Sequence, residues 1–151
     1  RFAKSQRQNQ EKGTQIMSHK VKWAGKRQFT ASTPDGRIGI YDVPKSHGGD
    51  GTAPTPMEAV LHSLAACTMV DVISILEKMR LPIESLEVEI DSERAPDHPK
   101  VYTKIHLKFI VTGDLPEKKV QRAIELSANK YCSIGAMLNS TTEITHELVL
   151  N

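Results

Sequence analysis

Residues 55–71 read Thr55-Pro-Met-Glu-Ala-Val-Leu-His-Ser-Leu-Ala-Ala-Cys-Thr-Met-Val-Asp71, and they open the longest helical pattern in the chain. Thr55 followed three residues later by Glu58 is a capping-box signature, and Pro56 suits the first helical position. Apolar residues then recur at helical spacing to about Met79, before Leu81-Pro82. The pattern predicts one long helix with Cys67 in its apolar stripe.

Strands are expected on both sides of this helix. Residues 19–24, 28–33 and 37–43 predict an antiparallel meander, with Pro34-Asp35-Gly36 as a tight turn. Residues 86–91 and 101–109 alternate as a hairpin, and residues 143–150 form a last strand. The order βββ-α-ββ-α-β predicts an α+β fold with antiparallel sheets around a long central helix.

A second helix is expected to start near Asp114-Leu-Pro-Glu117, with Gly135 marking a break after it. Its apolar stripe would comprise Val120, Ala123, Ile124, Ser127 and Tyr131.

Composition indicates one ordinary globular domain, expected over residues 17–151. The chain has 151 residues, 38% hydrophobic and 25% charged. Residues 1–16 are polar and carry a net charge of +3, so the remaining chain falls from +2 overall to −1. We expect this tail to be disordered or vector-derived, with Met17 as the native start. The charge balance argues against a nucleic-acid partner.

The location is predicted from what the sequence lacks. We expect no membrane partner, because no uninterrupted apolar run reaches spanning length. No signal peptide is evident, and two cysteines are too few for a disulfide framework. These observations favour the reducing cytoplasm.

The two cysteines, Cys67 and Cys132, are either plain core residues or a reactive thiol with a resolving partner. Neither has zinc-ligand spacing, and no metal or organic cofactor is expected. Cys67 lies twelve residues into its helix, beyond the reach of the helix dipole, and apolar surroundings would raise its pKa. A nucleophilic Cys67 would therefore need a cation from elsewhere. Asp71 shares its helix face and is expected to point to solvent or to a cation.

The segment from Gly51 to Thr68, followed by Tyr131-Cys-Ser-Ile-Gly-Ala136, resembles the OsmC/Ohr family of organic hydroperoxide reductases. The Trp23…Asp35-Gly36 opening also falls in family order, so the resemblance covers residues 19–151. It implies a thiol peroxidase that is an intertwined homodimer. Its substrates would be organic peroxides and also hydrogen peroxide. An external dithiol, of the lipoyl type in this family, would reduce the oxidised enzyme. The resemblance gives this activity a role in oxidative-stress defence.

The resemblance also implies residue roles. Cys67 matches the peroxidatic cysteine and Cys132 the resolving one, so that a Cys67 sulfenic acid would become a Cys67–Cys132 disulfide. Arg27, eight residues before Asp35, matches the arginine that holds the thiolate. Glu58, nine residues before Cys67, is the candidate for the glutamate that orients this arginine. If Glu58 acts at a cysteine, we expect it to do so across a dimer interface, because nine helical residues rise roughly 13 Å.

Two positions depart from the family pattern. In the organic hydroperoxide resistance branch the acid lies ten residues before the cysteine, where this chain has Met57, whereas an acid at the position of Glu58 is common in the OsmC branch. The capping box accounts for Glu58 equally well. Ser133 stands where the family commonly has proline after the second cysteine. The alternative function is therefore a binding or stress-associated protein that keeps the fold without peroxidase turnover. A hydrolytic cysteine enzyme is disfavoured, because no histidine is placed by sequence as its base.

Overall fold

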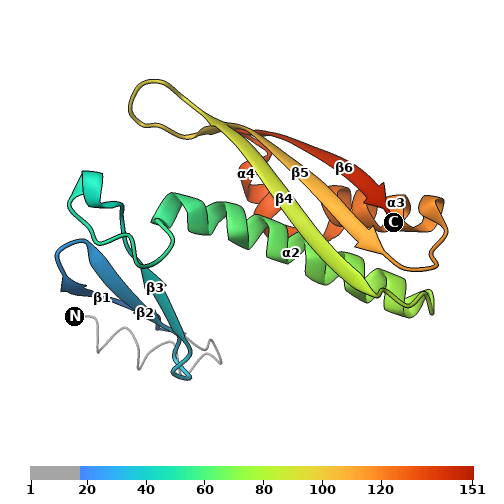
Figure 1. Cartoon of the computed structure of the whole chain (residues 1–151), viewed down its shortest axis with the longest axis horizontal. Helices are drawn as coiled ribbons and strands as arrows, with labels where there is room; N and C mark the ends of the chain where they lie inside the picture. The colour runs from blue at the N-terminus through green and yellow to red at the C-terminus, as the bar shows by residue number, and fades with distance from the viewer. Residues whose placement is uncertain (1–17) are drawn as a thin grey trace, which may run out of the picture. The chain divides into compact units, whose positions relative to one another are not determined.

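The computed structural model describes residues 18–151 and divides the chain into two compact units, one ending at Ala59 and the other comprising Val60–Asn151 (Figure 1). The expectations for residues 1–16 and for Met17 lie outside the described residues.

The N-terminal unit contains an antiparallel meander of β1 (Lys20–Gly25), β2 (Gln28–Ser32) and β3 (Ile38–Tyr41). The predicted meander is confirmed, including its second turn, where the Gly36 amide donates to the Thr33 carbonyl at 3.0 Å. Gly36 has φ +90°, a conformation that glycine adopts without strain. A short 3-10 helix, η1 (Lys45–His47), lies in the following loop.

Both faces of this meander carry exposed large apolar side chains. The register places Val21 and Trp23 on one face, and Ile38 and Ile40 on the other. Trp23 is 71% exposed and Val21 67%. All hydrophobic side chains that the described residues bury lie between Leu64 and Cys132, in the other unit. The meander therefore lacks a hydrophobic core of its own.

A buried carboxylate organises the loop after the meander. Asp42 is 1% exposed and accepts hydrogen bonds from the amides of Val43 and Thr52, at 2.8 and 3.1 Å, and from the Thr52 hydroxyl at 2.8 Å. These donors, those of Thr52 above all, lower the pKa of Asp42 to about 2. Hydrogen bonding to the ionised form therefore holds the loop around Asp42.

Helix α2 (Pro56–Lys78) matches the predicted helix to within a residue at its C-terminal end. Its capping box is formed: the Thr55 amide donates to Glu58 Oε2 at 2.8 Å, and the Glu58 amide donates to Thr55 Oγ1 at 3.2 Å. From Val60 onward the helix belongs to the C-terminal unit, where one stripe is buried. That stripe comprises Leu64, Ala65, Thr68, Val72 and Leu76.

By length and composition, one helix of the described residues could cross a membrane, although no uninterrupted apolar run reaches that length. The expectation of no membrane partner stays a prediction. Helix α2 has 23 residues and a mean hydropathy of 1.9 over its most apolar window, of which 28% is buried. Dispersed polar residues such as His62 and Ser63 interrupt any continuous apolar run without lowering this mean much. A core helix of a soluble protein can have the same length and hydropathy. Helix α2 buries one stripe of side chains but leaves Val70 62% exposed.

The C-terminal unit is built on a sheet of β4 (Ser85–Arg94), β5 (Tyr102–Thr112) and β6 (Glu143–Leu150). Strands β4 and β5 form the predicted antiparallel hairpin, and Lys108 pairs with Glu89 across it at 3.2 Å. Strand β6 pairs with β5 in parallel, which corrects the expectation of purely antiparallel sheets. The reason is the connection: the chain returns from β5 through helices, and such crossovers join parallel strands.

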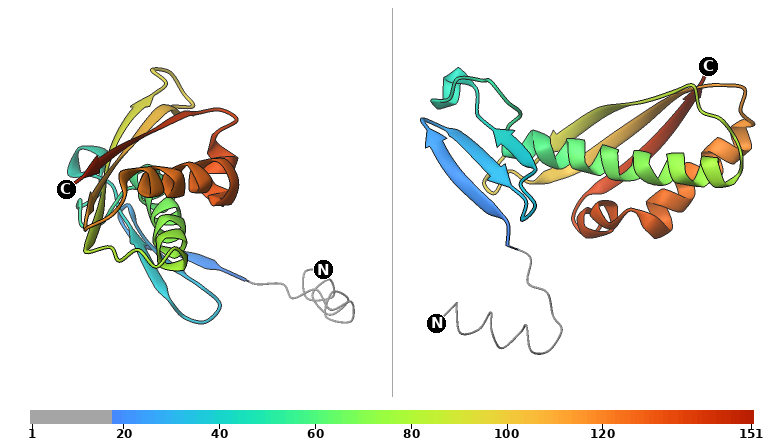
Figure 2. Two further views of the ribbon diagram at one scale, coloured as in Figure 1. Left: turned by 90° about the vertical axis from the view of Figure 1, so that its right-hand side faces the viewer. Right: turned by 90° about the horizontal axis from the view of Figure 1, so that it is seen from below.

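That connection consists of α3 (Glu117–Leu126), the π-helical turn η2 (Ser127–Tyr131) and α4 (Ser133–Leu138). Together with α2 these helices lie on one face of the β4–β5–β6 sheet (Figure 2). The core between them includes Phe109 and Leu107 of β5 against the buried stripes of α2 and α3. The mixed α+β architecture predicted from the sequence is thus observed.

The π-helical turn changes the phase of the second helix. Val120, Ala123, Ile124 and Ser127 are buried as predicted. Tyr131, the expected next member of the stripe, is 49% exposed. The Cys132 amide instead bonds the Ser127 carbonyl at 2.9 Å, five residues back, so Cys132 is buried in place of Tyr131.

The break predicted at Gly135 is also misplaced. The chain turns at Cys132, whose ψ of 102° is extended, and Gly135 lies buried inside α4. A Cβ at Gly135 would lie 3.4 Å from Cys132 Sγ and 3.7 Å from Leu64 Cδ1. Glycine at this position therefore reflects close packing against α2 and the cysteine, and not a helix end.

Candidate thiol site

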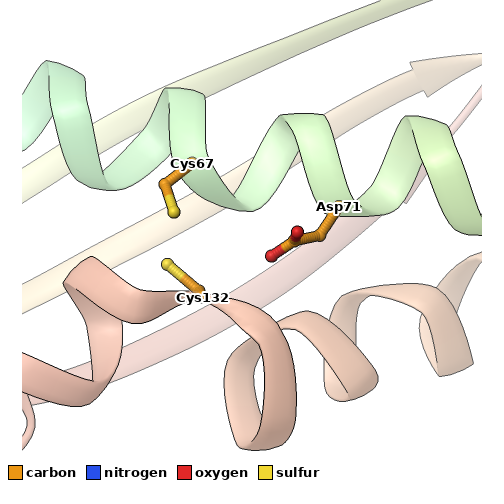
Figure 3. Close-up of side chains that lie close together, drawn as sticks. All are labelled: Cys67, Asp71 and Cys132. Carbon is orange, nitrogen blue, oxygen red and sulfur yellow. The ribbon is translucent and has the colours of Figure 1, made fainter. Parts of the chain in front are cut away.

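Three sequence-distant groups meet between α2 and the start of α4. Cys67 and Asp71 extend from successive turns of α2, and Cys132 extends toward them from the junction of η2 and α4 (Figure 3). The two sulfur atoms and a carboxylate oxygen of Asp71 all lie within 4.8 Å of one another. All three residues belong to the C-terminal unit. Both cysteines are free thiols.

Cys132 is the more enclosed of the two thiols, with 4% of its surface exposed. As the residue that caps α4, it accepts a hydrogen bond from the Gly135 amide at 3.2 Å. The hydroxyl of Thr68, which directly follows Cys67 in α2, is 3.6 Å from the same sulfur and also donates to the Leu64 carbonyl at 3.0 Å. These donors hold the Cys132 sulfur on the side facing α2.

Asp71 does not simply point to solvent or to a cation, as the sequence led us to expect. It is half-buried, and its Oδ2 accepts a hydrogen bond of 2.7 Å from the hydroxyl of Ser127. Ser127 is fully buried and begins the π-helical turn. The hydroxyl supplies the donor that makes this position tolerable for a carboxylate beside two thiols.

The Cys67 thiol has a raised pKa, as its apolar setting predicted. Burial is the largest cause, and the Cys132 thiol and the Asp71 charge raise the pKa further. A backbone hydrogen bond from Ile134, in the first turn of α4, acts in the opposite direction. None of the described groups that shift this pKa is a cation. A nearby positive group would lower this pKa and favour the Cys67 thiolate.

The two other predicted site residues, Arg27 and Glu58, belong to the N-terminal unit, whereas both cysteines belong to the C-terminal unit. Arg27 is exposed in the turn between β1 and β2, where its Nε would be 3.9 Å from a Cβ at Gly48. Glu58 makes the capping box with Thr55 described above. The structural role of Glu58 is thus observed, and the catalytic roles of Arg27 and Glu58 stay predictions.

A cavity of about 400 Å³ adjoins Cys132, within the C-terminal unit. Its wall includes Thr68, Glu125, Asn129 and His146, but not Cys67. His146 stacks on Phe109, and burial, with a smaller effect from His106, lowers its pKa. Sequence reasoning missed this histidine, because its alternation within β6 marked it only as a strand residue. The cavity gives solvent-borne molecules a route to the second cysteine.

Comparison with known proteins agrees with this fold. The OsmC-like protein family matches residues 49–147. Protein YhfA of Escherichia coli K12 is 42% identical over 131 residues, which cover 86% of this chain and 95% of YhfA. The chain belongs to the OsmC-like protein family.

Solved structures extend the likeness to the fold. An osmotic stress induced and detoxification response protein from Psychrobacter arcticus has a TM-score of 0.80 at 18% identity, covering 90% of this chain and 98% of the other. An organic hydroperoxide resistance protein from Elizabethkingia anophelis has a TM-score of 0.69 at 13% identity, covering 91% and 98%. The α+β architecture with a long helix is therefore shared with proteins of distant sequence.

Proposed function

We propose that this protein is a cysteine-based peroxidase that reduces organic hydroperoxides, and hydrogen peroxide less well, in oxidative-stress defence. The observation that supports it most is the meeting of the Cys67 and Cys132 sulfur atoms within 4.8 Å. Family membership and the neighbour named as an organic hydroperoxide resistance protein agree with this chemistry.

The proposed cycle has three steps. The Cys67 thiolate attacks one peroxide oxygen, the O–O bond breaks, and the alkoxide leaves with a proton as the alcohol. The Cys67 sulfenic acid then condenses with the Cys132 thiol, which forms the disulfide and releases water. An external dithiol, of the lipoyl type, reduces the disulfide by thiol–disulfide exchange. This cycle needs no cofactor, and we propose that it operates in the cytoplasm.

Arg27 is proposed to supply the missing cation at Cys67. Because the pKa of this thiol is raised, a nearby positive charge would favour the thiolate. An arginine guanidinium is always charged and can also contact a peroxide oxygen. Glu58 is proposed to orient Arg27, in addition to capping α2. These two roles rest on the resemblance to the family and on the raised pKa of Cys67, to which no described cation contributes.

A homodimer is proposed as the working form. The meander exposes Val21 and Trp23 on one face and Ile38 and Ile40 on the other, and α2 exposes Val70 and Ile73. Exposed apolar surface on two elements is typical of a protein interface. A second copy of the chain, wrapped around these surfaces, would supply the hydrophobic core that the meander lacks.

The test is consumption of cumene hydroperoxide by the reduced protein, with mass spectrometry of the thiols before and after. We expect peroxide loss in proportion to protein and a Cys67–Cys132 disulfide. Cys67→Ser should abolish consumption, whereas Cys132→Ser should stop at a sulfenic acid that a dimedone probe traps. Untouched peroxide and two free thiols in the wild type would exclude the peroxidase cycle. That result would instead support a binding or stress-associated protein without turnover.

A further inference from the structure

We propose that the reduced protein binds one Zn²⁺ ion through Cys67, Asp71 and Cys132. Their three donor atoms lie within 4.8 Å of one another, and no residue outside the C-terminal unit is needed. Cys67 and Asp71 are four residues apart in α2, which places both ligands on one helix face. Cys132 approaches that face from the junction before α4.

The donor geometry fits a tetrahedral ion. Zinc–sulfur bonds of about 2.3 Å place two ligand sulfurs about 3.8 Å apart, and zinc–oxygen bonds of about 2.1 Å bring the carboxylate slightly closer. Each separation falls within the 4.8 Å limit that the present side chains satisfy. Side-chain rotation alone can therefore complete three corners, leaving the fourth for water or an exogenous ligand.

The ligands also have supporting hydrogen bonds. Ser127 donates to Asp71 Oδ2, which leaves Oδ1 available for the ion. The Gly135 amide donates to the Cys132 sulfur. Such contacts orient metal ligands and reduce the reorganisation that binding requires. The donor set itself, two thiolates and one carboxylate, favours zinc over calcium or magnesium, which take oxygen ligands.

The charge of the three ligands and the cavities beside them also favour binding of a divalent cation. Three anionic ligands in one half-buried cluster would repel one another, and a divalent cation compensates two of the three charges. The cavity beside Cys132 and a second one of about 340 Å³, lined by Asp71 and Tyr131, reach the cluster's surroundings. A hydrated ion thus has a path to the ligands.

Zinc binding and oxidation are mutually exclusive in this arrangement. The two thiols release their protons as the ion binds. A hydroperoxide would take two electrons from the thiolates and, with two protons, become alcohol and water; the S–S bond forms and Zn²⁺ is released. The binding proposal does not depend on peroxidase turnover, since it needs only the reduced thiols.

The test is titration of the reduced, chelator-treated full chain with Zn²⁺ against a chromophoric competitor. We expect one ion per chain with a submicromolar dissociation constant. Cys67→Ser and Cys132→Ser should each weaken binding at least about 100-fold, and Asp71→Asn at least about 10-fold. Asp91→Asn, an exposed carboxylate on β4, is the matched control and should bind as the wild type does. Protein oxidised to the disulfide should not bind.

A spectroscopic measurement on the wild type guards against misfolded variants. Co²⁺ should give a sulfur-to-cobalt charge-transfer band and the intense visible bands of tetrahedral coordination, both removed by added Zn²⁺. Absence of the charge-transfer band, or equal zinc affinity in the oxidised form, would overturn the proposal. Zinc binding without peroxide consumption would support this zinc site and exclude the peroxidase. Peroxide consumption without zinc binding would support the peroxidase and exclude the zinc site.

Discussion

Asp71 of α2 and Ser127 of the π-helical turn are joined by a hydrogen bond of 2.7 Å, directly beside the two cysteines. The bond links the helix that carries Cys67 to the segment that positions Cys132. It also retains a carboxylate where its charge opposes thiolate formation, since Asp71 is among the groups that raise the pKa of Cys67. Two predictions concern this pair.

Asp71→Asn should lower the pKa of the Cys67 thiol, because the substitution removes a negative charge that destabilises the thiolate. The rate of Cys67 alkylation by iodoacetamide, measured against pH in zinc-free buffer, should rise at a lower pH than in the wild type. Asp91→Asn is the control with the same chemical change on β4. An alkylation profile identical to that of the wild type would show that the Asp71 charge does not reach the sulfur.

Ser127→Ala should destabilise the protein by about 1–2 kcal/mol, because a buried donor to a carboxylate is lost. It should also slow formation of the Cys67–Cys132 disulfide by diamide, because the turn before Cys132 is held less firmly. Ser74→Ala is the matched control: the Ser74 hydroxyl donates to Val70 within its own helix at 2.8 Å. Chemical denaturation and timed thiol quenching measure both effects, and equal behaviour of the two variants would contradict the role given to Ser127.

Gly49→Ala should destabilise the N-terminal unit by about 3 kcal/mol, because there is no room for the added methyl group. A Cβ at this position would lie 2.6 Å from Asp42 Oδ1 and closer still to the Val43 carbonyl oxygen. Gly39→Ala, whose Cβ would meet Tyr41 only at ordinary contact distance, is the control. Thermal unfolding followed by Trp23 fluorescence reports on this unit. An unchanged melting temperature would mean that the loop around Asp42 opens readily.

Asp42→Asn should remove a pH-dependent part of the stability. The folded-state pKa of about 2 lies below the ordinary 3.8, so the carboxylate favours folding. That contribution is fully present above about pH 4 and is lost as the pH falls through about 2. The melting temperature of Asp42→Asn should therefore be lower than that of the wild type at neutral pH, and the difference should shrink toward pH 2. Asp97→Asn, on the exposed β4–β5 connection, should show no such convergence.

Val70→Asp should dissociate the proposed homodimer. Val70 is 62% exposed on α2, and a charge there would have to be buried without a partner at a helix–helix interface. Sedimentation velocity should show a dimer for the wild type and for Lys100→Asp, which changes the β4–β5 connection. A wild-type monomer, or a Val70→Asp dimer of unchanged affinity, would place the interface elsewhere.

Local signals explain which elements could be predicted from sequence. The capping box and Pro56 define the start of α2, and regular alternation defines the β4–β5 hairpin. The parallel pairing of β6 follows from the path of the connection and not from the strand's own pattern. The proximity of the two thiols could be taken only from the family resemblance, because no local pattern relates Cys67 to Cys132. The Asp71–Ser127 bond had no sequence signal at all.

The π-helical turn has a consequence for how the second helix tolerates insertions and deletions. A regular α-helix advances about 100° per residue, and the turn from Ser127 to Tyr131 accommodates one residue more than an α-turn would. Removing a single residue there would restore a regular helix and move Cys132 into the helical position that Tyr131 would otherwise hold. The length of this turn therefore determines which side chain faces Cys67.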